Sequence, residues 1–230
     1  MMARARRIVL WTAAAALFLG GPAGILPIFV SAVHADSARV VSIKETRDYQ
    51  DPALLNKAWA LPVAAAYQAD IEFQQNGSVC GPTSVANVLH SLKQAGNQES
   101  ILQGSGFSTV MGYLPEGLTL DQLATIARQK LHRKVTVLHD LDLAAFREQL
   151  RHVNDPARRY IINFSRALLF GTGGGHHSPI AAYLSEEDLV LVLDVNKKYG
   201  SWLVKSDRLY EAMNTVDDTA QKKRGLLLIE

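Results

Sequence analysis

Apolar residues recur with helical spacing along the first two thirds of the chain. The stretch 80–92 places them at i, i+3, i+4 and i+7 (Val85, Val88, Leu89, Leu92), which predicts a half-buried helix that begins near its cysteine. Similar patterns predict helical pieces within 54–67 and helices at 118–127, 142–150 and 207–213. Thr119 suits the N-terminal cap of the helix at 118–127. We interpret most of these segments as scaffold.

From about residue 159 onward the pattern changes to that of strands. Runs rich in β-branched and apolar residues occupy 160–164, 178–183, 189–195, 201–204 and 225–229, and shorter ones occupy 40–43 and 135–138. The run 189–195 is apolar on both faces, so it should be an interior strand, whereas 201–204 suits an edge. Helices first and strands later predict an α+β fold in which consecutive strands pair antiparallel.

The first 35 residues differ from the remainder. Arginines precede an apolar run, glycines and a proline interrupt it, and small residues follow before Asp36, which is the pattern of a secretory signal peptide. Because apolar character resumes over 25–33, an uncleaved membrane anchor is the alternative. Either reading predicts an exported protein, and the periplasm is the expected compartment. Residues 36–70 then form an N-terminal arm, and 71–230 form the main domain.

Composition narrows the classes of function. Of 230 residues, 48% are hydrophobic and 20% charged, as in an ordinary globular protein. The net charge is only +2, and part of it lies in the first seven residues, which argues against a nucleic-acid partner. The single cysteine excludes an intrachain disulfide and a thiolate metal cluster, and we expect neither a structural metal nor a cofactor.

That cysteine, Cys80, is a candidate nucleophile. At a helix N-terminus, the dipole and the unpaired backbone N–H groups favour the thiolate, which is the reactive form of the side chain. A lone cysteine can equally be a small core residue. The rest of the chain must therefore supply the other parts of the chemistry.

Two other parts of the chain supply candidates for them, a pair of histidines and an aspartate. His176 and His177 follow a glycine run at the entrance of a strand, where neighbouring side chains point to opposite faces, so at most one of them should face a given site. Asp194 lies 18 residues beyond His176, near the end of the next strand, and a buried carboxylate there needs a partner. The plain alternative is that Asp194 only caps the following loop.

Together these residues form a chemical set: a cysteine to attack, a histidine to accept its proton and an aspartate to orient the imidazole. Gln74, six residues before Cys80, could supply an oxyanion donor beside the Cys80 backbone N–H, with Gln75 as the alternative. The glycine run lacks dinucleotide or P-loop spacing, so a phosphate site is disfavoured.

Three linked motifs carry a resemblance to a known family. They read Gln74-Gln75-Asn76-x-x-x-Cys80-Gly81, Gly-Gly-Gly175-His176-x-Ser178-Pro179 and Leu193-Asp194-Val195. Over roughly 74–228 the chain resembles the catalytic domain of phytochelatin synthases, especially the short bacterial forms, which belong to the papain-like cysteine peptidase clan. The resemblance implies a helical part with the cysteine helix packed on an antiparallel sheet that carries His and Asp.

The resemblance also implies roles. Cys80 would be the acylated nucleophile, His176 rather than His177 the base, Asp194 its orienter and Gln74 the oxyanion donor. For the anionic γ-glutamyl carboxylate of the substrate, Arg166 and Arg224 occupy places where family members carry similar arginines. Tyr183 and Asp217 or Asp218 are further candidates for substrate recognition.

The implied substrate and partner is glutathione. Cleavage of its Cys–Gly bond would release glycine and leave a γ-glutamylcysteinyl thioester on Cys80. Water would hydrolyse this thioester, or its γ-glutamylcysteinyl group would be transferred to a second glutathione to form phytochelatin. Because the sequence ends without the cysteine-rich half of the plant enzymes, hydrolysis or slow transfer is expected. Metal ions would enter as thiolates of the substrate, consistent with a role in metal detoxification.

Two rival readings remain at this stage. One is a papain-clan peptidase that cuts peptides, for example leader sequences after a double glycine. The other is a catalytically idle exported binding protein with the same fold. The sequence leaves open whether the chain forms a homodimer.

Overall fold

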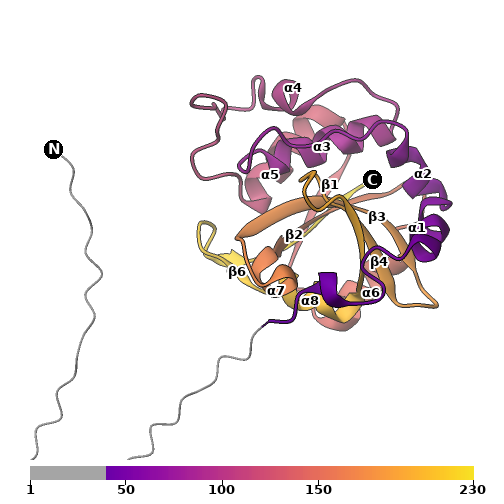
Figure 1. Cartoon of the computed structure of the whole chain (residues 1–230). Coiled ribbons are helices and arrows are strands. Elements are labelled where there is room, and N and C mark those ends of the chain that lie inside the picture. The colour runs from indigo at the N-terminus through magenta and orange to yellow at the C-terminus, as the bar shows by residue number, and fades with distance from the viewer. Residues whose placement is uncertain (1–39) are drawn as a thin grey trace, which may run out of the picture. The chain divides into compact units, whose positions relative to one another are not determined.

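The computed structural model describes residues 40–230, which belong to one compact unit. The predicted signal peptide or anchor at 1–35 lies outside this part of the chain. The structure is built on a six-stranded sheet, with a separate two-stranded hairpin (Figure 1). Its strands are β1 (Val135–His139), β2 (Arg159–Ser165), β3 (Gly175–Leu184), β4 (Leu189–Leu193), β5 (Ser201–Lys205) and β8 (Gly225–Ile229), and the hairpin is β6 (Val216–Asp217) with β7 (Lys222–Lys223).

The strand order is β1-β8-β2-β3-β4-β5, and every described pair is antiparallel. The prediction that consecutive strands pair is confirmed from β2 to β5. It is wrong for the last strand, because β8 inserts between β1 and β2. As predicted, β4 is an interior strand and β5 an edge strand.

Helices cover both faces of the sheet (Figure 1). They are α1 (Pro52–Trp59), α2 (Pro62–Gln68), α3 (Cys80–Ser91), α4 (Gln98–Leu102), α5 (Leu120–Leu131), α6 (Leu143–Arg151), α7 (Arg166–Phe170) and α8 (Ser206–Met213), preceded by a 3-10 turn at Ile43–Glu45. Of the helices between residues 40 and 230, none has the length and hydropathy needed to cross a membrane.

Successive side chains along the strands point to opposite faces of the sheet, so the hydrophobic core has two parts. On one face Ile161, Leu191 and Leu227 pack with α1, α2, α3 and α5, and on the other Ile162 and Trp202 pack with α6, α7 and α8. Each large apolar side chain that is fully buried in this way contributes roughly 1.5–3 kcal/mol. The sheet is therefore covered by a hydrophobic core on each face, and α3 packs against β3 on the face that also carries α1, α2 and α5.

Several local predictions need correction or refinement. Residues 40–43 form no strand, because the Ser42 side chain caps the 3-10 turn that follows it. The helical pieces of 54–67 are two helices separated at Pro62, whose ring cannot continue the first helix. Both contribute to the same core as α3. Strand β3 begins at Gly175, three residues earlier than predicted, so both histidines lie within it.

Candidate active site

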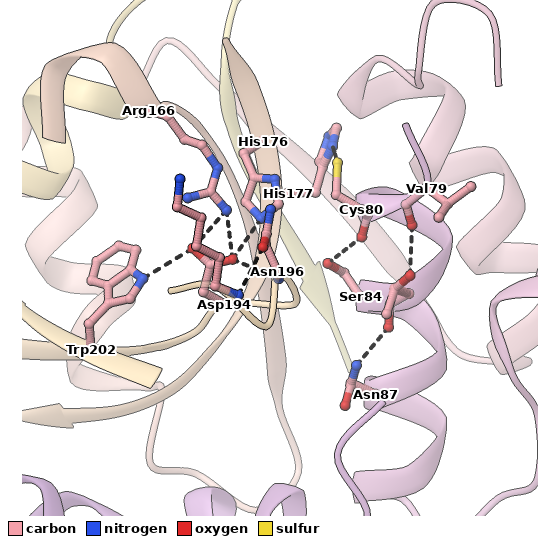
Figure 2. Close-up of polar contacts among 12 residues, drawn as sticks. Val79, Cys80, Ser84, Asn87, Arg166, His176, His177, Asp194, Asn196 and Trp202 are labelled. Carbon is pink, nitrogen blue, oxygen red and sulfur yellow. Dashed lines mark hydrogen bonds and ion pairs between the residues drawn. The ribbon is translucent and has the colours of Figure 1, made fainter. Parts of the chain in front are cut away.

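Cys80 is the first residue of α3 and is nearly buried, with 7% of its surface exposed. The helix has no side-chain cap, so its first backbone N–H groups face the space around the thiol. One turn further on, the Thr83 and Ser84 hydroxyls donate to the Val79 and Cys80 carbonyls at 2.8 Å and anchor this end of the helix (Figure 2). The thiol is thus placed at the positive end of a rigid helix.

His176 and Asp194 lie next to one another, as predicted. The His176 Nε2 is 3.1 Å from Asp194 Oδ1, and both side chains are buried. A carboxylate only accepts hydrogen bonds, so Nε2 carries a proton and the other ring nitrogen is free to accept one. The Phe164 ring packs edge-on against the imidazole at 5.5 Å between centroids and limits its rotation.

Asp194 has no exposed surface and accepts hydrogen bonds from several sides (Figure 2). Arg166 Nη2 lies 2.6 and 2.8 Å from its two oxygens, the Trp202 Nε1 donates at 3.1 Å, and the Asn196 backbone N–H donates at 2.9 Å. Burial alone raises the pKa of Asp194, but these interactions, led by the hydrogen bond and charge of His176, lower it to about 2.

This arrangement corrects the role predicted for Arg166. The residue directly follows β2 and begins α7, and its side chain is buried against the carboxylate. Its guanidinium also lies over the Tyr199 ring at 4.0 Å. Because the Arg166 side chain is buried against Asp194 and does not line the cavity beside the thiol, it holds Asp194 and is not placed to bind a substrate carboxylate.

His177 makes a second set of contacts. Its Nδ1 lies 3.8 Å from the Cys80 Sγ, and its Nε2 lies 2.8 Å from Asn163 Nδ2, directly across the β2–β3 pair. Asn163 Oδ1 accepts from Arg224 Nη1 at 2.8 Å, and the same Nη1 reaches Asp217 Oδ2 at 2.9 Å. A chain of polar groups therefore runs from the thiol to the hairpin.

The expectation that only one histidine faces the site is wrong. The register does place them on opposite faces, with His176 opposite Phe164 and His177 opposite Asn163. However, His177 Nδ1 lies 3.8 Å from the Cys80 sulfur, and the charge and hydrogen bond of His176 also lower the pKa of the thiol, so both imidazoles affect it.

The electrostatics favour a thiolate paired with an imidazolium. Burial raises the pKa of the Cys80 thiol, but the charge of His176 and the hydrogen bonds of His176 and His177 outweigh it and lower that pKa well below its ordinary value. Burial lowers the pKa of His176, but Cys80 and Asp194 outweigh it and raise that pKa. A buried thiol with these neighbours is a strong nucleophile near neutral pH.

A cavity of about 600 Å³ opens beside the thiol. Its lining includes Cys80, His177, Asn163, Arg224 and Asp217. Arg224 Nε is buried without a partner among the described residues. Of the predicted substrate-binding residues, Arg224, Asp217 and Asp218 line the cavity, and Arg166 and Tyr183 do not.

Gln74 and Tyr183 complete the predicted set. The Gln74 backbone N–H donates to the Val195 carbonyl at 2.8 Å, which brings this segment beside Asp194, while its side-chain Oε1 is buried and unpaired among residues 40–230. The alternative, Gln75, points elsewhere and contacts Gln98 and Glu99. Tyr183 is not at the site, because its hydroxyl donates to Asp188 near the far end of β3.

Three residues of the site were not singled out from the sequence: Asn163, Trp202 and Asn196. Asn163 carried a detectable signal, since it is the one polar residue within an otherwise apolar strand run. Within the described part of the chain, no group of three His, Cys, Asp or Glu side chains is arranged to hold a metal ion.

A helix that begins with a cysteine, packed on an antiparallel sheet that supplies histidine and aspartate, is the arrangement of the papain-like cysteine peptidase fold. Among solved structures, a putative C39-like peptidase from Bacillus anthracis has a TM-score of 0.51 at 12% identity, over 71% of this chain and 95% of that one. At this identity the likeness concerns the fold alone. Residues 50–226 match the phytochelatin synthase family model, and the chain belongs to that family.

Curated relatives agree with this assignment. The chain is 33% identical over 117 residues to glutathione gamma-glutamylcysteinyltransferase 3 of Lotus japonicus, covering 50% of this chain and 24% of that protein. It is 29% identical over 118 residues to glutathione gamma-glutamylcysteinyltransferase of Schizosaccharomyces pombe, covering 50% of this chain and 28% of that protein. The matched region thus spans about a quarter of the length of these relatives.

Proposed function

We propose that this protein cleaves the Cys–Gly bond of glutathione through a thioester on Cys80, with Cys80, His176 and Asp194 as its catalytic triad. The observation that carries the proposal is the buried Cys80 thiol, paired with His176 and opening on a cavity, in a member of the phytochelatin synthase family. A cavity of about 600 Å³ with Arg224, Asp217 and Asp218 in its wall suits a small zwitterionic peptide.

The steps follow from the contacts. The Cys80 sulfur attacks the cysteinyl carbonyl, and an S–C bond forms while the oxygen takes up negative charge. The Cys80 backbone N–H and the Gln74 side-chain amide are the proposed donors to that oxyanion. His176, held by Asp194, gives its proton to the glycine nitrogen as the C–N bond breaks.

The thioester then has two fates. Water, losing its proton to His176, yields γ-glutamylcysteine and regenerates the thiol. Alternatively, the amine of a second glutathione attacks, and the product is a phytochelatin. Metal ions take part in this proposal only as thiolates of the substrate, and Arg224 is the proposed partner of a substrate carboxylate.

The test is incubation of the purified full chain with glutathione, with and without cadmium or zinc. Mass spectrometry would follow glycine, γ-glutamylcysteine and phytochelatin, and Cys80→Ala is the matched control. We expect glycine release that the variant lacks. Equal glycine release by the two proteins, or none from either, would refute the proposal, and cleavage of peptides with indifference to glutathione would point to a peptidase instead.

Gln74→Ala tests the oxyanion assignment separately. Loss of one oxyanion donor typically costs about 10²–10³ in kcat. Acyl-enzyme formation should slow by about that factor while the thiol still reacts with iodoacetamide, because alkylation forms no oxyanion. An unchanged acylation rate would remove Gln74 from the mechanism and leave Cys80 in it.

A further inference from the structure

The side-chain amide of Asn163 has a defined orientation in this site. Its Oδ1 lies 2.8 Å from Arg224 Nη1, and a guanidinium has donors but no acceptor, so the oxygen must face Arg224. The amide nitrogen therefore faces His177 Nε2 at 2.8 Å. Because an amide NH₂ group only donates, His177 Nε2 must accept this hydrogen bond.

This chain of contacts determines where the proton of His177 lies. With Nε2 as an acceptor, the imidazole is neutral and carries its hydrogen on Nδ1, the atom 3.8 Å from the Cys80 sulfur. His176 has the opposite tautomer, since its Nε2 donates to Asp194. The two adjacent histidines thus present different groups to one sulfur atom: a ring nitrogen of His176 that gains and loses a proton, and a fixed N–H donor from His177.

We propose that His177 is a second catalytic histidine, which acts as a neutral hydrogen-bond donor to the Cys80 thiolate and not as a base. His176 gains and loses a proton during each turnover, so it stabilises the thiolate only while it is protonated. The N–H of His177 stays in place, because Asn163 and Arg224 hold the imidazole in one tautomer. It stabilises the thiolate before attack and again when the thioester expels it.

Other charged groups surround this pair. His176 on β3 faces the thiol, Arg224 precedes β8, and Asp217 lies on β6 of the hairpin. Glu116 and Asp218 line the same cavity. Replacement of His177 removes the N–H that lies 3.8 Å from the sulfur and leaves these charges in place.

The proposal rests on Cys80 being the nucleophile but not on glutathione being the substrate. Alkylation by iodoacetamide, which needs no substrate, can therefore test it. In the full chain, the pH dependence of Cys80 alkylation would be measured for the wild type, His177→Phe, His177→Gln and His176→Ala. We expect His177→Phe to raise the apparent pKa of the thiol by about one. At pH values below the thiol pKa of the wild type, the fraction of thiolate would then fall about tenfold.

The glutamine variant is the matched control, because its amide can also donate to the sulfur. We expect His177→Gln to retain most of the alkylation rate, whereas a profile for His177→Phe identical to that of the wild type would overturn the proposal. So would a His177→Gln variant that is as impaired as His177→Phe.

A spectroscopic measurement avoids substitution altogether. The ring nitrogens of His177, labelled with ¹⁵N, should show a protonated Nδ1 and an unprotonated Nε2 in the free protein, and those of His176 a protonated Nε2. A proton on His177 Nε2 at neutral pH would overturn the assignment. If glutathione proved not to be the substrate, both results would still hold, so the two proposals fail separately.

Discussion

Asp194 illustrates how single residues control this site. It is fully buried, yet it remains charged because Arg166, His176, Trp202 and the Asn196 backbone surround it with donors. These donors make the carboxylate a fixed charge that orients His176. The cost of burying it is offset only while all the partners are present.

The replacement Asp194→Asn should therefore affect both activity and stability. It leaves the Arg166 guanidinium buried without its carboxylate, which typically costs about 3–5 kcal/mol. In the proposed reaction, turnover of glutathione should fall by roughly 10³-fold or more, because the amide no longer fixes the tautomer of His176. Urea unfolding and initial rates of glycine release would measure the two effects.

The stability conferred by Asp194 should also depend on pH. Its pKa is lowered in the folded protein from 3.8 to about 2, so its contribution is complete above pH 3.8 and is lost as the pH falls towards 2. This amounts to about 2 kcal/mol. In Asp194→Asn the free energy of unfolding should decline less over this range, whereas Asp140→Asn, on the exposed surface, should follow the wild type. Parallel curves for all three proteins would contradict the expectation.

At the scale of elements, the long side chain of Arg224, which precedes β8, reaches past β2 to the beginning of β3. A Cβ on Gly175 would overlap the guanidinium of Arg224, the group that orients Asn163. Glycine at this position therefore lets the arginine pass across the strand. The neighbouring Gly174 has open space where its Cβ would be.

This difference gives a matched pair of variants. In Gly175→Ala, Arg224 must move away from Asn163, and we expect turnover to fall by about tenfold to a hundredfold. The melting temperature should change little, because the displaced group is the end of a flexible side chain. Gly174→Ala should behave as the wild type in both measurements, and an equal loss of activity in the two variants would show that Arg224 is not the cause.

At the scale of the whole molecule, the last strand completes the sheet. β8 lies between β1 and β2, and within the described residues β1 pairs with no other strand. Leu227 and Ile229 of β8 belong to the core on the α3 face, and Leu226 and Leu228 to the core on the opposite face. Both cores thus depend on residues near the end of the chain.

A chain shortened to end at Arg224 should therefore fail to fold cooperatively. It lacks β8, which leaves β1 unpaired and opens both cores. A chain lacking only Glu230 should still fold, with a modest loss from the two backbone hydrogen bonds to Lys134. Circular dichroism during thermal unfolding would distinguish the two, and a cooperative transition in the shorter chain would contradict the expected role of β8.

Periodicity alone was enough to predict most elements, because each amphipathic stretch must bury one face. The α3, α5, α6 and α8 helices and the strands from β2 to β5 appear close to their expected positions. The five-residue helices α4 and α7 were missed, since so short a segment shows little periodicity. The insertion of β8 could not be read from the sequence, because pairing partners depend on the path of the chain through space.

The sequence by itself determined that Cys80 and Asp194 need a chemical explanation, because a lone cysteine begins a predicted helix and a carboxylate lies near the end of an apolar strand, whereas the choice of His176 over His177 was implied only by the family resemblance. Only the tertiary structure decided what surrounds them. In the structure Arg166 binds Asp194, and the Tyr183 hydroxyl donates to Asp188, away from the site. His177 lies beside the same sulfur as His176. The physical reason is that a side chain's role depends on which donors and acceptors lie within about 3–4 Å of it, and residues far apart in the sequence supply them.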